Sequence, residues 1–102
     1  MDMSSMVKQA QEFQAKMGQL QEELGKRTVS SEAGGGMVKA VVNGQNMVVS
    51  LQIEKEVINP DDSDMLQDLI IAAVNDGMRK AREMVQSEMS KLTGGIKIPG
   101  LM

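Results

Sequence analysis

The stretch Gly34–Glu54, GGGMVKAVVNGQNMVVSLQIE, decides the fold of this chain. It contains two runs of β-branched and apolar residues, Met37–Asn43 and Met47–Glu54, which the segment Asn43–Asn46 joins. Asn and Gly adopt the positive φ angles that a tight hairpin turn requires, so Asn-Gly between two such runs predicts a β-hairpin. The three glycines at the start let the chain turn into the first strand without side-chain clashes.

Alternation within these two runs predicts an antiparallel sheet with one apolar and one mostly polar face, as in a sheet covered on one side. A shorter alternating segment, Arg27–Ala33, is predicted to add a third strand at the edge of the sheet. The apolar face is expected to hold Val38, Ala40 and Val42 from the first run and Val49, Leu51 and Ile53 from the second, with Val48, Ser50, Gln52 and Glu54 on the opposite face.

The segment before the sheet, Met1–Arg27, carries apolar residues at alternating intervals of three and four, which predicts an amphipathic helix with a heptad seam. Ser4 and Ser5 are candidate N-caps, and Gly25 suits the C-terminal end. The remaining positions are rich in Gln and are expected to face solvent, although Gln also hydrogen-bonds to adenine in DNA grooves. The seam consists of Met3, Met6, Ala10, Phe13, Met17, Leu20 and Leu24.

The segment after the sheet opens with the residues of a helix N-terminus. Asn59 supplies an N-cap, Pro60 fits the first helical position, and acidic residues follow in the first turn. A metal site made from Asp61, Asp62 and Asp64 is the alternative, but no loop of further oxygen ligands follows, so capping is favoured.

This last helix is predicted to end at about Leu92 and to carry a broad apolar stripe. Within the stripe, Ala73, Gly77 and Ala81 recur every four residues, a spacing that allows another helix to cross closely; coincidence is the alternative. Residues 1–93 are predicted to form a single domain, and residues 94–102 a flexible C-terminal tail.

Composition narrows the classes of function. The 102 residues include no Cys and no His, which removes disulfides, thiolate and imidazole nucleophiles and the usual zinc ligands. The triple glycine lacks the spacing and the Ser or Thr of a Walker loop. We therefore expect no enzyme, no cofactor and no small-molecule substrate. No apolar run is long enough for a membrane span or a signal peptide.

The formal net charge of −3 hides an asymmetry along the last helix. Residues 60–76 hold five acids and no base, whereas residues 77–102 hold five bases and two acids. Matching to the helix dipole explains this pattern at about 0.3–1 kcal/mol per charge. Contact between the basic end and phosphate is the functional alternative.

Both predicted helices are longer than the sheet. At 1.5 Å per residue they measure about 36 and 48 Å, whereas the strands span about 25 Å. Their apolar stripes nevertheless continue to Met3 in one helix and Leu92 in the other, and an apolar stripe left in water marks an interaction site. We therefore expect a symmetric homodimer with paired helices projecting from a sheet-bearing body.

Four segments resemble the YbaB/EbfC family of bacterial nucleoid-associated proteins: GGGMVKAVVNGQ (Gly34–Gln45), LQIEKEVINPDD (Leu51–Asp62), DMLQDLIIAAVNDGMRKA (Asp64–Ala81) and MSKLTGGIKIPGL (Met89–Leu101). The resemblance implies an α+β fold in the order α-β-β-β-α, with a small three-stranded antiparallel sheet flanked by long helices. It implies a tweezer-like homodimer whose projecting helices grip duplex DNA, located in the cytoplasm on the nucleoid. It assigns no individual DNA-contacting residue.

Eight basic side chains on the two predicted helices are candidates for contact with phosphate. The single aromatic residue disfavours base stacking on single strands, so we expect duplex binding with low sequence specificity. A dimeric protein–protein adaptor is the alternative, because Met-rich surfaces adapt to varied partners. The eight candidates are Lys8, Lys16, Lys26, Arg27, Arg79, Lys80, Arg82 and Lys91.

Overall fold

A computed structural model of the chain describes residues 2–92. Helix α1 leads into three strands, two short 3₁₀ helices follow, and helix α2 completes the chain, so the predicted α+β class and α-β-β-β-α order are confirmed. The tail expected at residues 94–102 lies outside the described residues. The elements are α1 (Met3–Lys26), β1 (Thr28–Ala33), β2 (Val38–Asn43), β3 (Val48–Ile53), η1 (Lys55–Val57), η2 (Pro60–Asp62) and α2 (Ser63–Leu92).

The three strands form one antiparallel sheet in the order β1-β2-β3, with β1 at an edge as predicted. The Asn43 side chain closes the β2–β3 turn, because its Oδ1 accepts hydrogen bonds from the backbone N–H groups of Gln45 and Met47, both at 3.0 Å. Asn46 adopts a φ of 64°, the left-handed conformation that Asn tolerates. The hairpin predicted from Asn-Gly is therefore confirmed.

The register between β2 and β3 corrects the predicted face of β3. Ala40 lies opposite Leu51, but Val42 lies opposite Val48, with an irregularity between Val41 and Val42. Opposite residues of an antiparallel pair place their side chains on the same face. Val48, and not Val49, therefore continues the apolar face, because a β-bulge inserts one extra residue and breaks the alternation.

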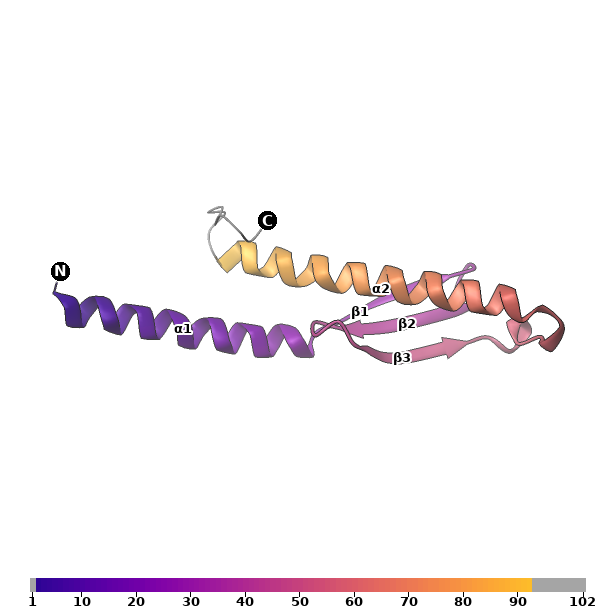
Figure 1. Ribbon diagram of the computed structural model, residues 1–102, viewed down its shortest axis with the longest axis horizontal. Coiled ribbons are helices and arrows are strands. Elements are labelled where there is room, and N and C mark those ends of the chain that lie inside the picture. Colours follow the sequence, from indigo (N-terminus) through magenta and orange to yellow (C-terminus); the bar gives the residue numbers. More distant parts are fainter. Residues whose placement is uncertain (1, 93–102) are drawn as a thin grey trace.

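The core lies between the sheet and α2. Val38, Ala40 and Val42 are fully buried, and the hydroxyl of Ser31 donates a hydrogen bond of 2.6 Å to the carbonyl oxygen of Ala73 in α2. Figure 1 shows α2 running along β1 and β2, with β3 further from the helix.

The small residues of α2 pack against the chain's own sheet, so the prediction of a crossing helix at that stripe is wrong. A Cβ added to Gly77 would lie 2.7 Å from Cγ2 of Val42 and 2.8 Å from the hydroxyl of Ser31. Ala73 and Ala81 are buried with it. The four-residue spacing thus lets the helix backbone approach the strands closely.

The ends of the helices confirm one capping prediction and correct two. Asn59 accepts a hydrogen bond of 3.0 Å from the backbone N–H of Asp61, as expected of a cap, but the helix that it caps is η2, and α2 itself begins at Ser63. The cap of α1 is Asp2, not Ser4 or Ser5, since its carboxylate accepts a hydrogen bond of 2.8 Å from the Ser5 N–H. Gly25 is not a C-cap: it lies inside α1, which ends at Lys26.

The molecule is strongly elongated, with extents of 72 × 22 × 16 Å and a radius of gyration of 19.5 Å. A compact domain of this length would have a radius of gyration of about 13 Å. Helix α1 accounts for much of the difference, because it extends beyond the sheet (Figure 1) and buries only Leu24 and Gly25. We call residues 3–23 the arm and the remaining described residues the body.

Candidate nucleic-acid interface

The β2–β3 turn holds the base of the arm. Gly44 packs against the backbone of Leu24, and its N–H donates a hydrogen bond of 3.0 Å to the carbonyl oxygen of Arg27. The side chain of Gln45 lies over Gly25, where an added Cβ would come within 3.2 Å of it. The direction in which α1 leaves the body is thus set by contacts with backbone atoms.

Lys8 and Lys26 lie on the side of α1 away from its apolar seam, whereas Lys16 lies on the flank of the seam. Lys8 and Lys26 are 18 residues apart, about five helical turns, so they point the same way, and Lys16 is about a quarter turn from them. All three are exposed. Helix α1 also carries three glutamates, Glu12, Glu22 and Glu23. The charges of its three lysines and three glutamates therefore sum to zero. The arm therefore offers individual cations rather than a strongly positive surface.

Five of the eight candidate cations are held by carboxylates of the same chain. Arg79 contacts Asp76 at 2.6 Å and Glu83 at 2.8 Å. These contacts are exposed surface ion pairs, which stabilise a protein only weakly, and a phosphate would have to compete with them. The other four pairs are Lys80–Asp76 at 3.3 Å, Lys26–Glu22 at 3.7 Å, Arg27–Glu88 at 3.2 Å and Lys91–Glu88 at 3.3 Å.

The remaining three candidates, Lys8, Lys16 and Arg82, have no carboxylate within 4.0 Å among residues 2–92. Lys8 and Lys16 lie on the arm, and Arg82 lies on the outer side of α2, about 140° around the helix from the buried Gly77. These three side chains are exposed. All eight were predicted from the sequence as candidates for phosphate contact, and the structure separates the three without a carboxylate partner in residues 2–92 from the five with one.

The carboxylates in these pairs are stabilised in their charged form. Hydrogen bonds from Arg79 and Lys80 lower the pKa of Asp76 below its ordinary value. Contact with Lys91, and secondarily with Arg27, lowers the pKa of Glu88. The same Asp76 and Glu83 contacts raise the pKa of Arg79. Both Asp76 and Glu88 therefore remain ionised at neutral pH and keep compensating their basic neighbours.

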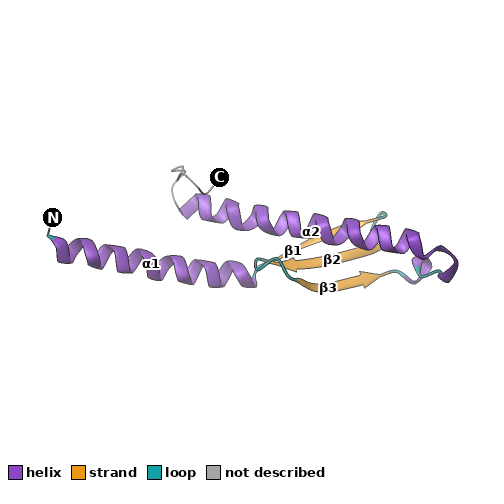
Figure 2. Ribbon diagram, in the orientation of Figure 1, coloured by secondary structure: helices purple, strands orange, loops and turns teal. Residues whose placement is uncertain are grey.

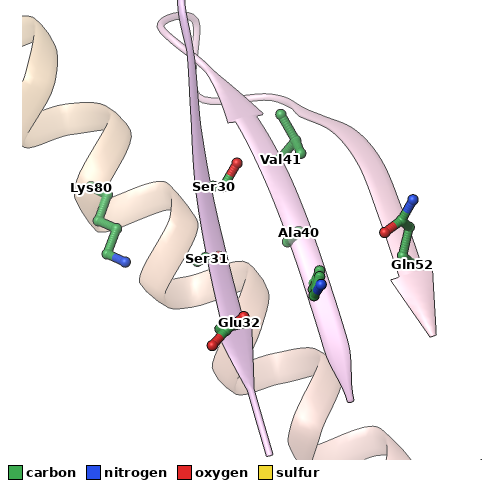
Figure 3. A pocket seen from close by; sticks show the side chains of 8 residues that line it. Ser30, Ser31, Glu32, Ala40, Val41, Gln52 and Lys80 are labelled. Atoms are coloured by element: carbon green, nitrogen blue, oxygen red, sulfur yellow. The ribbon is translucent and has the colours of Figure 1, made fainter. Parts of the chain in front are cut away.

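A shallow polar hollow of ≈ 540 Å³ lies beside the sheet, lined by residues that include Ser30, Glu32 and Lys80. Figure 3 shows Lys80 on α2, beside β1, and Ser30 and Glu32 on β1. Lys80 is paired with Asp76, and the neighbouring Ser31 hydroxyl is bonded to a backbone carbonyl. Lys80 and Ser31 are therefore engaged with other groups of the chain.

Two further observations concern other classes of site. Within residues 2–92 no three His, Cys, Asp or Glu side chains gather in a way that could hold a metal ion. Asp62 instead accepts a hydrogen bond of 3.4 Å from the backbone N–H of Met65, as a capping residue does. No helix in the described part of the chain has the length and apolar character needed to cross a membrane.

Comparison with known proteins places these features in context. The family model of the YbaB/EbfC DNA-binding family matches residues 1–96. A nucleoid-associated protein of Pelotomaculum thermopropionicum is 56% identical over 100 residues, which cover 98% of this chain and 95% of that protein. A nucleoid-associated protein of Syntrophobacter fumaroxidans is 53% identical over 95 residues, which cover 93% of this chain and 86% of that protein.

A solved structure shares the fold. The crystal structure of an uncharacterized protein from Helicobacter pylori superposes with a TM-score of 0.77 at 27% sequence identity. The match covers 91% of this chain and 98% of the other. The similarity therefore extends over nearly the whole length of both proteins.

Proposed function

The chain belongs to the YbaB/EbfC DNA-binding family, and from this premise we propose that it acts as a homodimer that binds duplex DNA through its projecting helices. Binding has low sequence specificity and serves nucleoid organisation or gene regulation in the cytoplasm. The observation that carries the proposal is the placement of Lys8, Lys16 and Arg82, which are exposed on the two long helices and have no carboxylate partner in residues 2–92.

Low specificity follows from the kind of contact these side chains make. Lysine and arginine that neutralise phosphates bind any sequence, because the backbone carries no base information. The chain has one aromatic residue, Phe13, so it offers no row of stacking platforms for unpaired bases. Duplex DNA read by charge and shape is therefore the favoured ligand.

The homodimer is supported by the shape of the single chain. Seven of the exposed large apolar side chains lie on the arm and on β3, where the chain itself provides no cover: Met3, Met6, Val7, Phe13, Val48, Val49 and Leu51. A single domain would normally bury such residues, and a symmetric pair of chains is the commonest solution for soluble proteins.

A gel-shift assay on two duplexes of unrelated sequence tests the proposal. With micromolar protein at 50 mM salt we expect both duplexes to shift, and at 500 mM salt we expect both shifts to disappear, because released counterions make the affinity salt-dependent. A single-stranded DNA of the same length serves as the control and should shift less. Absence of any shift of either duplex at 50 mM salt would refute DNA binding.

One observation favours a second function, that of a dimeric protein–protein adaptor. The apolar seam of the arm is exposed at Met3 by 80% and at Phe13 by 53%, which suits a helix partner of another protein. A pull-down after nuclease treatment separates the two functions. A specific protein retained by wild type but lost on Phe13→Glu would support the adaptor.

A further inference from the structure

Arg27 and Lys91 converge on a single carboxylate oxygen. Nη1 of Arg27 lies 3.2 Å from Oε1 of Glu88, and Nζ of Lys91 lies 3.3 Å from the same atom. Arg27 directly follows α1, whereas Glu88 and Lys91 belong to α2. We call these three residues the Glu88 cluster. It gathers two cations from distant parts of the chain around one anionic oxygen.

Helix spacing does not account for the Arg27–Glu88 contact. Of the six ion pairs in residues 2–92, five join residues three or four apart on one helix, and Arg27–Glu88 joins α2 to another part of the chain. The helix dipole does not favour Glu88 either, because this carboxylate lies near the negative, C-terminal end of α2. The two cations that Glu88 meets therefore compensate its charge there.

The backbone of Arg27 is held in place on both sides. Its N–H donates a hydrogen bond of 3.2 Å to the carbonyl oxygen of Leu24, and its own carbonyl oxygen accepts one of 3.0 Å from the N–H of Gly44. Lys91 lies in the last turn of α2. Both cations thus extend from ordered backbone, and an anionic oxygen in the place of Oε1 would meet both of them.

The Glu88 cluster has a surplus of positive charge. Arg27 and Lys91 share one carboxylate, so two cations face one anion. The network around Asp76 differs, because it pairs two cations with two carboxylates. The surplus attracts a further anion even while Glu88 is in place.

The cluster lies at the base of the arm. Figure 2 shows α1 and the C-terminal part of α2 extending beyond the same end of the sheet. Arg27 is about 17 Å along α1 from Lys16, at 1.5 Å per residue. A duplex carries one phosphate for about every 1.7 Å of its axis, so a duplex bound along the arm has phosphates within reach of both positions.

We propose that the Glu88 cluster is a phosphate-binding site of the DNA interface, in which the Glu88 carboxylate occupies the position of a phosphate oxygen until DNA displaces it. The assignment rests on the DNA binding in the proposed function. Ion pairs to exposed cations are weak, whereas a duplex that contacts Arg27 and Lys91 releases counterions from its phosphates. Glu88 is thus an internal competitor that weakens DNA binding without abolishing it.

Neutralisation of the competitor tests this assignment. Glu88→Gln keeps the size of the side chain and removes its charge, so we expect it to bind a labelled duplex about threefold more tightly or better in anisotropy titrations. The slope of log affinity against log salt concentration should not change, because the same phosphates are neutralised. In a chain that also carries Arg27→Gln and Lys91→Gln, the gain should vanish, and the slope should be less steep by about 0.9 for each lost cation.

Glu23→Gln is the matched control. Glu23 is exposed near the base of the arm and has no cation within 4.0 Å among residues 2–92. Its neutralisation changes the net charge by the same amount, so it reports the long-range effect of charge alone. Its gain in affinity should be smaller than that of Glu88→Gln and should persist when Arg27 and Lys91 are replaced.

The outcomes separate this assignment from the proposed function. If wild type binds DNA and Glu88→Gln binds no more tightly than Glu23→Gln, the site is overturned and DNA binding stands. If neither wild type nor Glu88→Gln binds a duplex at 50 mM salt, DNA binding itself is refuted, and the site with it.

Lysine acetylation read by mass spectrometry gives a second measurement on the wild-type chain. The side chain of Lys91 is 71% exposed, so it is open to the reagent. Lys39 is the reference, since it is exposed on β2, away from the two long helices. Duplex DNA should slow the acetylation of Lys91 and leave that of Lys39 unchanged. Acetylation of Lys91 at the same rate with and without the duplex would contradict the phosphate contact.

Discussion

Gly44 in the β2–β3 turn packs directly against the backbone carbonyl of Leu24 in the last turn of α1. The neighbouring hydrogen bond from the Gly44 N–H to the Arg27 carbonyl, at 3.0 Å, joins the same two segments. A turn of the sheet therefore fixes the direction of the arm. Because the contact involves backbone on both sides, no side-chain rearrangement can make room for a Cβ.

Gly44→Ala is expected to destabilise the chain and to loosen the arm. Overpacking against fixed atoms costs about 1–3 kcal/mol, measured as a fall in the free energy of unfolding in urea. Gly18→Ala is the matched control, since a Cβ there meets nothing within 4 Å. It should stabilise the chain by about 0.5–1 kcal/mol, because Ala favours a helix interior over Gly. Equal stability of Gly44→Ala and wild type would contradict the close packing.

Gly77→Ala is expected to destabilise the body itself rather than an interface. The new Cβ would press on Val42 and on the Ser31 hydroxyl, which already donates to Ala73. Strain of about 1–3 kcal/mol outweighs the gain in helix propensity of about 1 kcal/mol. The midpoint of thermal unfolding should fall, and the fall should be independent of protein concentration. A fall that disappears at high concentration would indicate that Gly77 serves a contact between chains.

Arg82 and Arg79 should differ in their contribution to DNA binding, although they lie three residues apart. Arg82 has no carboxylate partner within residues 2–92, whereas Arg79 is held by Asp76 and Glu83. Removal of one Lys or Arg that neutralises a phosphate makes the slope of log affinity against log salt concentration less steep by about 0.9. We expect Arg82→Gln to reduce the slope by about that amount per contact and Arg79→Gln to reduce it less, in fluorescence anisotropy titrations of a labelled duplex. The reverse order would show that the intrachain pairs do not govern phosphate contact.

Acid should weaken the folded chain partly through Asp76. Its pKa lies below the ordinary value of 3.8 because Arg79 and Lys80 bond to the carboxylate. The folded state thus binds this proton less readily than the unfolded chain, so the stabilisation is complete above about pH 4 and is lost as the pH falls through the lowered pKa. The free energy of unfolding in urea should fall less between pH 7 and pH 3 in Asp76→Asn than in wild type. Identical falls would show that the pair does not stabilise the fold.

The sequence predicted the order of elements because each depends on local chemistry. The Asn-Gly turn, the alternating strands and the Asn59 cap are readable from neighbouring residues, and all three are present. What it could not predict depends on register and on distant contacts. The bulge that moves Val48 onto the apolar face leaves no spacing signal, and only the packing of Gly77 on Val42 shows what the small stripe meets.

The same limit applies to the eight candidate phosphate-contacting side chains, because their carboxylate partners also depend on distant contacts. Counting Lys and Arg on two predicted helices named all eight cations, but which of them meets a carboxylate depends on contacts that spacing settles only in part. The pair Arg79–Glu83 follows from a four-residue interval, whereas Arg27–Glu88 joins opposite ends of the chain. Spacing alone would discount Arg79 and Lys26, but it would equally discount Lys8 and Lys16, which both lie four residues from Glu12.

The affinity of a Lys8→Glu, Lys16→Glu double variant for duplex DNA tests the central claim most directly. Both side chains lie on the arm without a carboxylate partner in residues 2–92, far from the core, so the variant should fold as wild type does. By anisotropy at 50 mM salt we predict a loss of affinity of at least about tenfold, because two phosphate contacts per chain become repulsions. Wild-type affinity in this variant would contradict DNA binding through the arms.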